Sequence, residues 1–267
     1  MDNFSMTIDS MSYPERAGAD PWIERVTGTL MNVVPWIFMV IGILGFLGNV
    51  MVLLVMFYNK MMRTVTNILI LNLAITDLLF ITLSLPFTAL DYYHSSWTMS
   101  DFVCRLDQYI YEVTAAVSIY IVVIMSAMRY IAVCHPLLSV SFGTTTNTIA
   151  FVSWTWLLVC VVFIPTLALF SKKHYDYNGT QYASCEIGNK QAEFAYYVWS
   201  FSFSFAIPII LLVGLYTPML IKLWTGELRS ASHAKTNSRA TRIVVAIVLL
   251  FVVCWLPFRV INLLSVS

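Results

Sequence analysis

Two ionisable side chains in long apolar stretches are the first candidates for chemistry. Asp77 lies midway along one apolar run, and Arg129 lies near the end of another. An arginine at the centre of a bilayer costs about 2.5–3.5 kcal/mol on insertion scales, so Arg129 is expected at the edge of its span. A carboxylate in the position of Asp77 must be neutralised by a proton, a cation or a partner, because bare burial is too costly.

Polar side chains on two other apolar runs are candidate partners for Asp77. Asn49 and Ser118 would join it to form a cluster of oxygen ligands, which suits a hard cation such as sodium. The alternative is a protonated Asp77 that only holds helices together. Beyond this possible allosteric sodium ion, the sequence indicates no metal site and no cofactor.

Catalysis has no candidate cluster. The histidines, His94, His135, His174 and His233, are scattered over loops on both sides of the predicted membrane, so neither metal-dependent nor nucleophilic catalysis is indicated. We therefore do not expect an enzyme. A membrane transporter or channel is the alternative function, and it would require polar lining along several helices or inverted repeats, neither of which the sequence shows.

The composition identifies the elements that must position these residues. The chain is 59% hydrophobic and 11% charged, with a mean hydropathy of +0.79, which excludes a soluble globular domain and a disordered chain. A hydrocarbon core about 30 Å thick needs about 20 helical residues. Six continuous apolar stretches meet this length, and their continuity favours helices over a β-barrel. They are residues 33–58, 67–90, 106–134, 146–170, 195–224 and 241–264. The predicted fold class is an all-α polytopic transmembrane bundle over residues 33–264, followed by a truncated end at residues 265–267.

Basic residues show which side of the membrane each loop faces. They gather after the first, third and fifth spans, with only Glu227 to oppose them. They are Lys60, Arg63, Arg129, Lys222, Arg229, Lys235, Arg239 and Arg242. The positive-inside rule makes that side cytoplasmic and the acidic tail of residues 1–32 extracellular. No apolar segment precedes the first span, so we expect no cleavable signal peptide, and the net charge of +1 does not indicate nucleic acid.

Cysteines on the exterior side predict a disulfide. Cys134, Cys160 and Cys254 lie within spans or at their inner ends, whereas Cys104 and Cys185 face the oxidising side. A bond between these two would tie the third span to the loop before the fifth. The alternative is two free thiols.

The loop at residues 171–193 would then lie over the mouth of the bundle. Its tyrosines and charges suit either ligand contact or a plain solvated loop. Asn178 in this loop and Asn3 in the tail fit the glycosylation sequon, and both fall on the predicted exterior.

Ordered motifs from about Gly45 to the end of the chain resemble the rhodopsin-like class, class A, of seven-helix G-protein-coupled receptors. Arg129 follows Cys104 by 25 residues, as in that class. The matching motifs are Gly48-Asn49-Val50, Leu71-Asn72-Leu73-Ala74 with Asp77, Trp97, Phe102, Cys104, Arg129-Tyr130, Trp154, Pro208, Tyr216, and Phe251 with Cys254-Trp255-Leu256-Pro257. The resemblance implies six of the seven helices, with truncation before the seventh. A fragment, a splice form and a non-signalling product all stay open.

Shorter segments are most like allatostatin-A and galanin receptors, with somatostatin receptors as near relatives. They are Leu85-Pro86-Phe87-Thr88-Ala89, Gln108-Tyr109, Val113-Thr114-Ala115 and Ser118-Ile119-Tyr120. The resemblance implies an extracellular neuropeptide ligand, a heterotrimeric G protein of the inhibitory class in the cytoplasm, and a multi-pass location in the plasma membrane. Amine receptors carry an aspartate seven residues after the third-helix cysteine, where this chain has Tyr111, which argues against an amine ligand.

The resemblance also assigns roles to residues. Ligand-binding candidates lie on the third span, the exterior loop and the sixth span: Gln108, Tyr111, Glu112, Glu186, Trp255, Arg259 and Asn262. Glu112 would receive a cation of the ligand, and Arg259 a carboxylate or an aromatic face, or the two would pair with each other.

An activation switch would repack between the pocket and the inner face through Ile119, Pro208, Phe251 and Trp255. Residues at the G-protein side would be Arg129, Tyr130 and Tyr216. One departure from the family matters, because Met128 stands where an acid usually precedes the arginine. Methionine cannot hold Arg129 in a resting position, so we hypothesise raised basal signalling.

Overall fold

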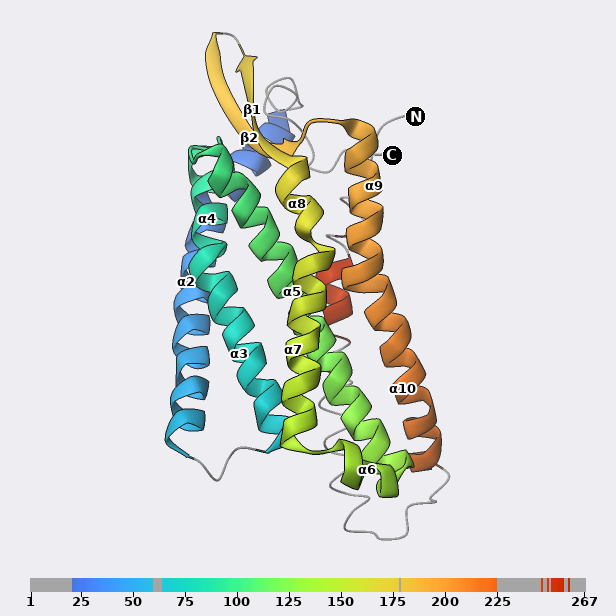
Figure 1. Ribbon diagram of the computed structural model, residues 1–267. Coiled ribbons are helices and arrows are strands. Elements are labelled where there is room, and N and C mark those ends of the chain that lie inside the picture. Colours follow the sequence, from blue (N-terminus) through green and yellow to red (C-terminus); the bar gives the residue numbers. More distant parts are fainter. Residues whose placement is uncertain are drawn as a thin grey trace.

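A computed structural model gives the fold, and long helices run side by side along the bundle (Figure 1). A β-hairpin covers one end, which we call the hairpin end, and we call the opposite end the Arg129 end. The structure describes residues 21–59, 64–177, 179–224, 246, 249, 251–256 and 259.

Successive long helices run in opposite directions between the two ends of the bundle (Figure 1). The helices are α2 (Pro21–Tyr58), α3 (Val65–Leu83), α4 (Leu85–His94), α5 (Asp101–Cys134), α6 (Pro136–Phe142), α7 (Thr145–Val162), α8 (Ile164–Leu169), α9 (Lys190–Phe201) and α10 (Ile207–Trp224). The strands are β1 (Phe170–Tyr177) and β2 (Thr180–Ile187), and the π-helical turn η2 (Ser202–Ala206) joins α9 to α10.

Five stretches of the described chain are long and apolar enough to cross a membrane. They are Val33–Tyr58, Val65–His94, Asp101–Cys134, Thr145–Leu169 and Lys190–Lys222. The sixth predicted span, residues 241–264, lies mostly outside the described residues, and those of its residues that are described are helical. The chain is therefore a multi-pass membrane protein with the predicted helical fold class.

Three helices, α2, α5 and α9, begin well before the apolar stretches that predicted them. Helix α2 begins at Pro21, so the last part of the predicted tail, residues 1–32, is helical. Helices α5 and α9 likewise begin five residues before the predicted starts at 106 and 195. Backbone hydrogen bonds and caps set these ends, and hydropathy does not record them. Ser100, for example, caps α5 by accepting a hydrogen bond from the Val103 amide.

Prolines divide two of the spans. Helix α3 ends before Ser84, and Pro86 lies in the first turn of α4; helix α7 ends before Phe163, and Pro165 lies in the first turn of α8. Proline lacks an N–H and its ring clashes with the carbonyl four residues earlier, so a helix that meets it ends or bends. Both breaks lie in the half of the bundle nearer the hairpin.

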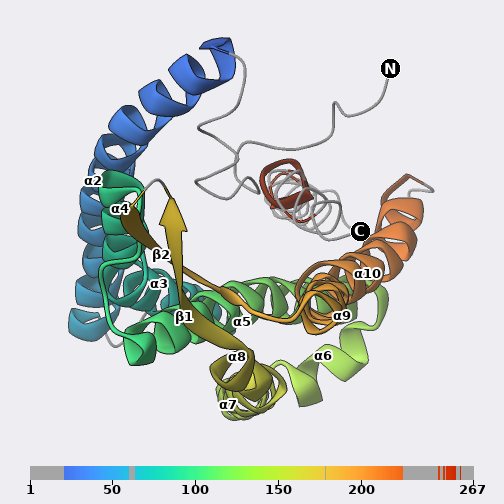
Figure 2. The same ribbon diagram turned by 90° about the horizontal axis from the view of Figure 1, so that it is seen from above.

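Helix α5 lies at the centre of the bundle, as the view from above shows (Figure 2). It packs against α3, α7, α8 and α10. Its buried residues form a continuous core with side chains from these neighbours, including Leu69, Val152, Leu212 and Met219. Helix α2 lies at the edge, and most of its large apolar side chains are exposed, as a lipid-facing helix requires.

The predicted exterior loop is an ordered hairpin. Its strands are antiparallel from Phe170↔Ile187 to Tyr177↔Thr180, and Gly179 at the turn has φ of +79°. Such a φ favours glycine because no side chain clashes there. The segment before α5 holds the hairpin, since the Trp97 amide donates to the Ala183 carbonyl at 2.7 Å and the Lys172 amide donates to Asp101 Oδ1 at 2.7 Å.

The predicted disulfide is confirmed. Cys104 at the start of α5 is bonded to Cys185 in β2, with 5.6 Å between their Cα atoms and a sequence separation of 81. Cys134 and Cys160 are partly buried free thiols, and Cys254 is an exposed one.

Candidate functional site

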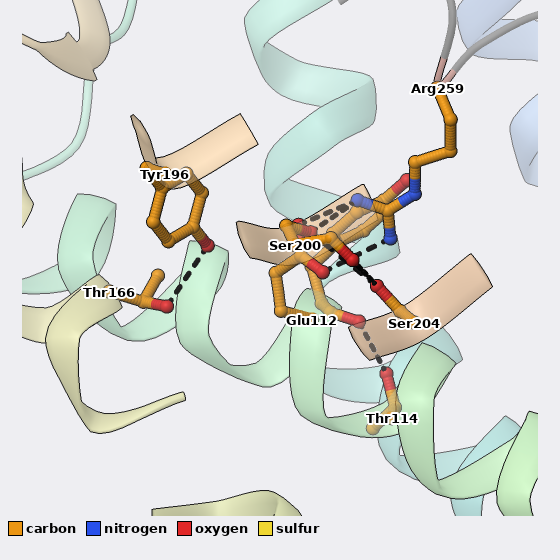
Figure 3. A network of polar contacts seen from close by, with 8 residues as sticks. Glu112, Thr114, Thr166, Tyr196, Ser200, Ser204 and Arg259 are labelled. Carbon is orange, nitrogen blue, oxygen red and sulfur yellow. Dashed lines mark hydrogen bonds and ion pairs between the residues drawn. The ribbon is translucent and has the colours of Figure 1, made fainter. Parts of the chain in front are cut away.

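A buried ion pair joins α5 to the last described part of the chain. Arg259 Nη1 and Nη2 each lie 3.1 Å from one oxygen of Glu112, so the contact is bidentate (Figure 3). Glu112 is 4% exposed and Arg259 is 5% exposed. Of the two arrangements left open by the sequence, the structure has the one in which these residues pair with each other.

A serine on α9 hydrogen-bonds both members of the ion pair. Arg259 Nη1 donates to Ser200 Oγ at 2.6 Å, and Ser200 Oγ donates to Glu112 Oε1 at 2.9 Å. Ser204, one turn along in η2, donates to the Ser200 carbonyl at 2.6 Å. Three segments of the chain thus meet at one polar centre inside an apolar bundle. A buried pair is stable only when its remaining donors and acceptors are bonded in this way.

The π-helical turn η2 brings a second contact. It follows directly after α9, and the Phe203 carbonyl within it accepts a hydrogen bond from Tyr120 of α5 at 2.9 Å. A π-helical turn widens the backbone spacing and so alters which carbonyls are available. Neither Ser200 nor a π-helical turn is among the features predicted from the sequence. Serines spaced by four residues on an apolar helix, Ser200 and Ser204, were the available signal.

Aromatic rings extend from the ion pair along the bundle. The Arg259 guanidinium lies 5.3 Å from the centre of the Trp255 ring, a cation–π contact. Trp255 in turn lies 6.0 Å from Tyr111 of α5 and 5.8 Å from Phe251. Phe251 stacks on Phe205 of η2 at 5.9 Å. Of the predicted switch residues, Trp255 and Phe251 are therefore in direct contact. Ile119 on α5 and Pro208 on α10 are fully buried.

The other predicted ligand-binding residues are less connected. Glu186 bonds within the hairpin, where the Tyr175 hydroxyl donates to Oε1 and the Ser184 hydroxyl donates to Oε2 at 2.9 Å. Burial raises the pKa of the Glu186 carboxyl, and Glu193 adds to this rise. Gln108 is half-buried on α5, one turn before Glu112. Asn262 lies outside the described residues.

The predicted sodium cluster is brought together only in part. Asn49 Nδ2 donates to the Gly45 carbonyl at 2.9 Å, and the Asn49 side chain lies close enough to interact with Asp77, which is exposed within the described part of the chain. The Ser118 hydroxyl instead shares a 2.8 Å hydrogen bond with Thr76. Two oxygen donors on α2 and α3 are thus adjacent, and the third bonds elsewhere. A hard cation would find Asp77 and Asn49 as its first ligands here.

At the Arg129 end, the arginine contacts an uncharged hydroxyl among the described residues. Arg129 Nη2 reaches Thr66 Oγ1 of α3 at 3.5 Å, and a cavity of about 200 Å³ adjoins Thr66, Met128 and Arg129. Tyr216 of α10 hydrogen-bonds Ser126 of α5 at 2.9 Å. Among the described residues, no carboxylate forms an ion pair with Arg129.

Tyr130 turns away from this cavity. Its hydroxyl lies 3.3 Å from His135 Nε2, and the two rings meet edge to face. The structure thus separates Tyr130 from the contacts of Arg129 and Tyr216.

Comparison with known proteins decides the class. A family model described as 7 transmembrane receptor (rhodopsin family) matches residues 48–267. The chain belongs to this family. The predicted receptor class is thereby confirmed.

Individual relatives of the receptor are neuropeptide-type receptors. An allatostatin-A receptor of Bombyx mori is 36% identical over 247 residues, which make up 91% of this chain and 68% of that protein. Somatostatin receptor type 2 of Mus musculus is 30% identical, over 93% of this chain and 67% of that receptor. A galanin-like G-protein coupled receptor of Caenorhabditis elegans is 28% identical, over 89% of this chain and 61% of that protein. The chain thus spans about two thirds of the length of these relatives.

Proposed function

We propose that this chain is part of a receptor for an extracellular neuropeptide that signals through a cytoplasmic heterotrimeric G protein of the inhibitory class. The observation that carries the proposal is the path of contacts from the Glu112–Arg259 pair through Trp255 and Phe251 to Phe205. It links a polar centre near the hairpin to the packing of α10, a helix that reaches the Arg129 end.

The similarity to named peptide receptors supports the ligand class. The relatives are receptors for allatostatin-A and somatostatin by name, and these are the peptides we propose to test first. The charges at the site also suit a peptide, because Glu112 and Arg259 offer both signs within one cluster. Nothing in this arrangement favours the transporter or channel alternative.

We place the receptor in the plasma membrane with the hairpin end and the N-terminal tail outside the cell. The disulfide between Cys104 and Cys185 supports this orientation, because disulfides persist in oxidising compartments. The distribution of basic loops supports it independently. Glycosylation at Asn3 and Asn178, both outside the described residues, and sodium at Asp77 and Asn49 stay parts of the proposal.

The mechanism is a shift between two populations. A peptide that binds one arrangement of the Trp255 region more tightly raises its population by that difference in affinity. Movement of Phe251 against Phe205 would then change the packing of α10. Tyr216 on that helix would exchange its bond to Ser126 for a position nearer Arg129, where the G protein binds.

The test is a signalling assay in cells that express the receptor at its full natural length. Allatostatin-A, somatostatin and galanin peptides are applied separately, and stimulated cyclic AMP is measured. We expect one of them to lower cyclic AMP. The control variant Arg129→Ala should bind the same labelled peptide but lose the response. Silence toward every peptide, together with uptake of a solute, would favour a transporter instead.

A further inference from the structure

Two carboxylates on α5 have equally little exposure but opposite surroundings. Asp107 and Glu112 are each 4% exposed. Glu112 has a bidentate arginine and a serine as partners. Within the described part of the chain, the Asp107 Oδ1 atom has no hydrogen-bond partner, and no cation pairs with Asp107. Among the described residues, the Glu112 carboxylate is thus paired with a cation and the Asp107 carboxyl group is not.

The nearest polar groups do not satisfy Asp107. Ser84 lies close enough to interact with it, yet the Ser84 Oγ atom is also buried without a hydrogen-bond partner. Ser84 is fully buried at the break between α3 and α4. Asp91 of α4 adds a second negative charge in the neighbourhood. Buried polar groups are nearly always bonded, so a pair of orphan oxygens next to another carboxylate indicates a missing donor.

The position suits a ligand group rather than a structural ion. Asp107 lies six residues into α5, which is about 9 Å along the axis from Asp101 at the hairpin end. One turn further along, Tyr111 lies on the same face and contacts both Phe80 of α3 and Trp255. Asp107 therefore adjoins the aromatic part of the candidate site, on the side toward α3 and α4.

We propose that Asp107, with the Ser84 hydroxyl, receives an ammonium or guanidinium group of the bound peptide. This inference rests on the proposed peptide-receptor function and assigns the ligand cation to Asp107, because Glu112 already has Arg259. Asp107 Oδ1 and Ser84 Oγ both accept hydrogen bonds, and Asp91 adds attraction for positive charge at short range. Amine receptors carry their aspartate at the position of Tyr111. Asp107 lies one turn nearer the hairpin end, so a cationic group that enters from that end reaches Asp107 without extending as far as Tyr111.

The first experiment tests, without a peptide, whether the site at Asp107 and Ser84 attracts a cationic reagent more than a neutral one. Ser84→Cys is introduced into the full-length receptor, with Cys134, Cys160 and Cys254 replaced by alanine. The rate of modification is measured for cationic aminoethyl methanethiosulfonate and for neutral methyl methanethiosulfonate. The ratio of the two rates reports attraction of a cation and cancels differences in access.

We expect Asp107→Asn to lower this ratio about 10-fold, and Asp107→Glu to retain most of it. The control is Glu193→Gln, which removes a carboxylate from the first turn of α9 and leaves the buried ion pair intact. It should change the ratio by less than about 2-fold. An unchanged ratio in Asp107→Asn, or no modification of Ser84→Cys by either reagent, would overturn the assignment.

A second measurement uses a peptide from the cyclic AMP assay, tested with its amino terminus free or acetylated and with each Lys or Arg replaced by norleucine. At least one of these changes to the peptide should weaken activation of the wild-type receptor about 10-fold. The same change should not weaken activation of the Asp107→Asn receptor further. Equal effects in both proteins would overturn the inference. Failure of every peptide would contradict the proposed function alone, because the reagent rates still decide the charge preference of Asp107.

Discussion

The two ends of the bundle hold their charged residues in different ways. Toward the hairpin end, a bidentate pair between Glu112 and Arg259 is buried, and a disulfide ties Cys104 to β2. At the Arg129 end, the hydrogen bond that Arg129 makes among the described residues is a 3.5 Å contact to the Thr66 hydroxyl. The hairpin end is therefore fixed by an ion pair and a covalent bond, whereas the described contact of Arg129 is to an uncharged hydroxyl.

This difference suits a protein that must detect at one end and respond at the other. Fixed groups keep a binding site in one arrangement, which reduces the entropy lost on binding. Weakly held groups let a small free-energy input shift a population, because each neutral hydrogen bond contributes only about 0.5–1.5 kcal/mol net. Variants that loosen the hairpin end or tighten the Arg129 end test this comparison directly.

Breaking the buried ion pair should have the largest effect. Glu112→Gln leaves the Arg259 charge without its partner, and such a loss costs about 3–5 kcal/mol. The thermal unfolding of detergent-solubilised receptor measures it. The control is the double variant Glu112→Leu with Arg259→Met, which replaces both charges by apolar groups and should be far closer to wild type. A single variant as stable as the double one would contradict a strong pair.

Loss of the disulfide should come next. Cys104→Ser with Cys185→Ser frees the hairpin from α5 across a separation of 81 residues. Removal of such a link costs about 2–4 kcal/mol, and the membrane, which already restricts the unfolded chain, favours the lower value. Unfolding temperature and cell-surface expression should both fall. Cys160→Ser, a free and partly buried thiol, serves as the control. Equal stability of both variants would show that hydrogen bonds alone hold the hairpin.

A new charge at the Arg129 end should reverse the contrast there. Met128→Asp places a carboxylate beside an arginine whose hydrogen bond among the described residues is to the Thr66 hydroxyl. A charge-assisted hydrogen bond contributes about 1.5–3 kcal/mol, so the resting arrangement should gain and ligand-free signalling should fall about 10-fold. Cyclic AMP without peptide measures this in full-length receptor. Met128→Asn supplies a neutral control of similar size. Identical basal signalling in wild type and Met128→Asp would reject the hypothesis.

The sequence was informative where a single residue type has one strong physical requirement. Long apolar runs predicted membrane helices, and two cysteines on the predicted exterior side indicated a bond. Five described spans and the Cys104–Cys185 disulfide agree with these predictions. Contacts between distant segments were harder. The ion pair was only one of two options, because Glu112 and Arg259 are 147 residues apart and their meeting depends on helix packing.

One local feature of the sequence indicates the hairpin turn. The dipeptide Asn178-Gly179 between residues of alternating character is typical of a two-residue hairpin turn, yet the segment was predicted as a loop. The orphan state of Asp107 could not be predicted, because it depends on where Ser84 lies at the break between α3 and α4. Absence of a partner is a property of the packed structure, and no residue pattern in one segment records it.

The smallest expected effect concerns pH and the hairpin. Burial raises the pKa of the Glu186 carboxyl above its ordinary value of 4.5, so the folded hairpin binds a proton more tightly than the unfolded chain does. The resulting stabilisation is complete below the ordinary pKa and is lost as pH rises through the raised value. The hairpin should thus be better protected at pH 5 than at pH 7, as measured by hydrogen exchange of β1 and β2 amides after correction for intrinsic rates. Glu186→Gln cannot titrate and should show no such difference.

A hairpin that instead loses protection as pH falls would mean that the ionised carboxylate, which accepts from Tyr175 and Ser184, stabilises the strands. In that case the hairpin would be held by charge-assisted bonds like those of the ion pair beneath it.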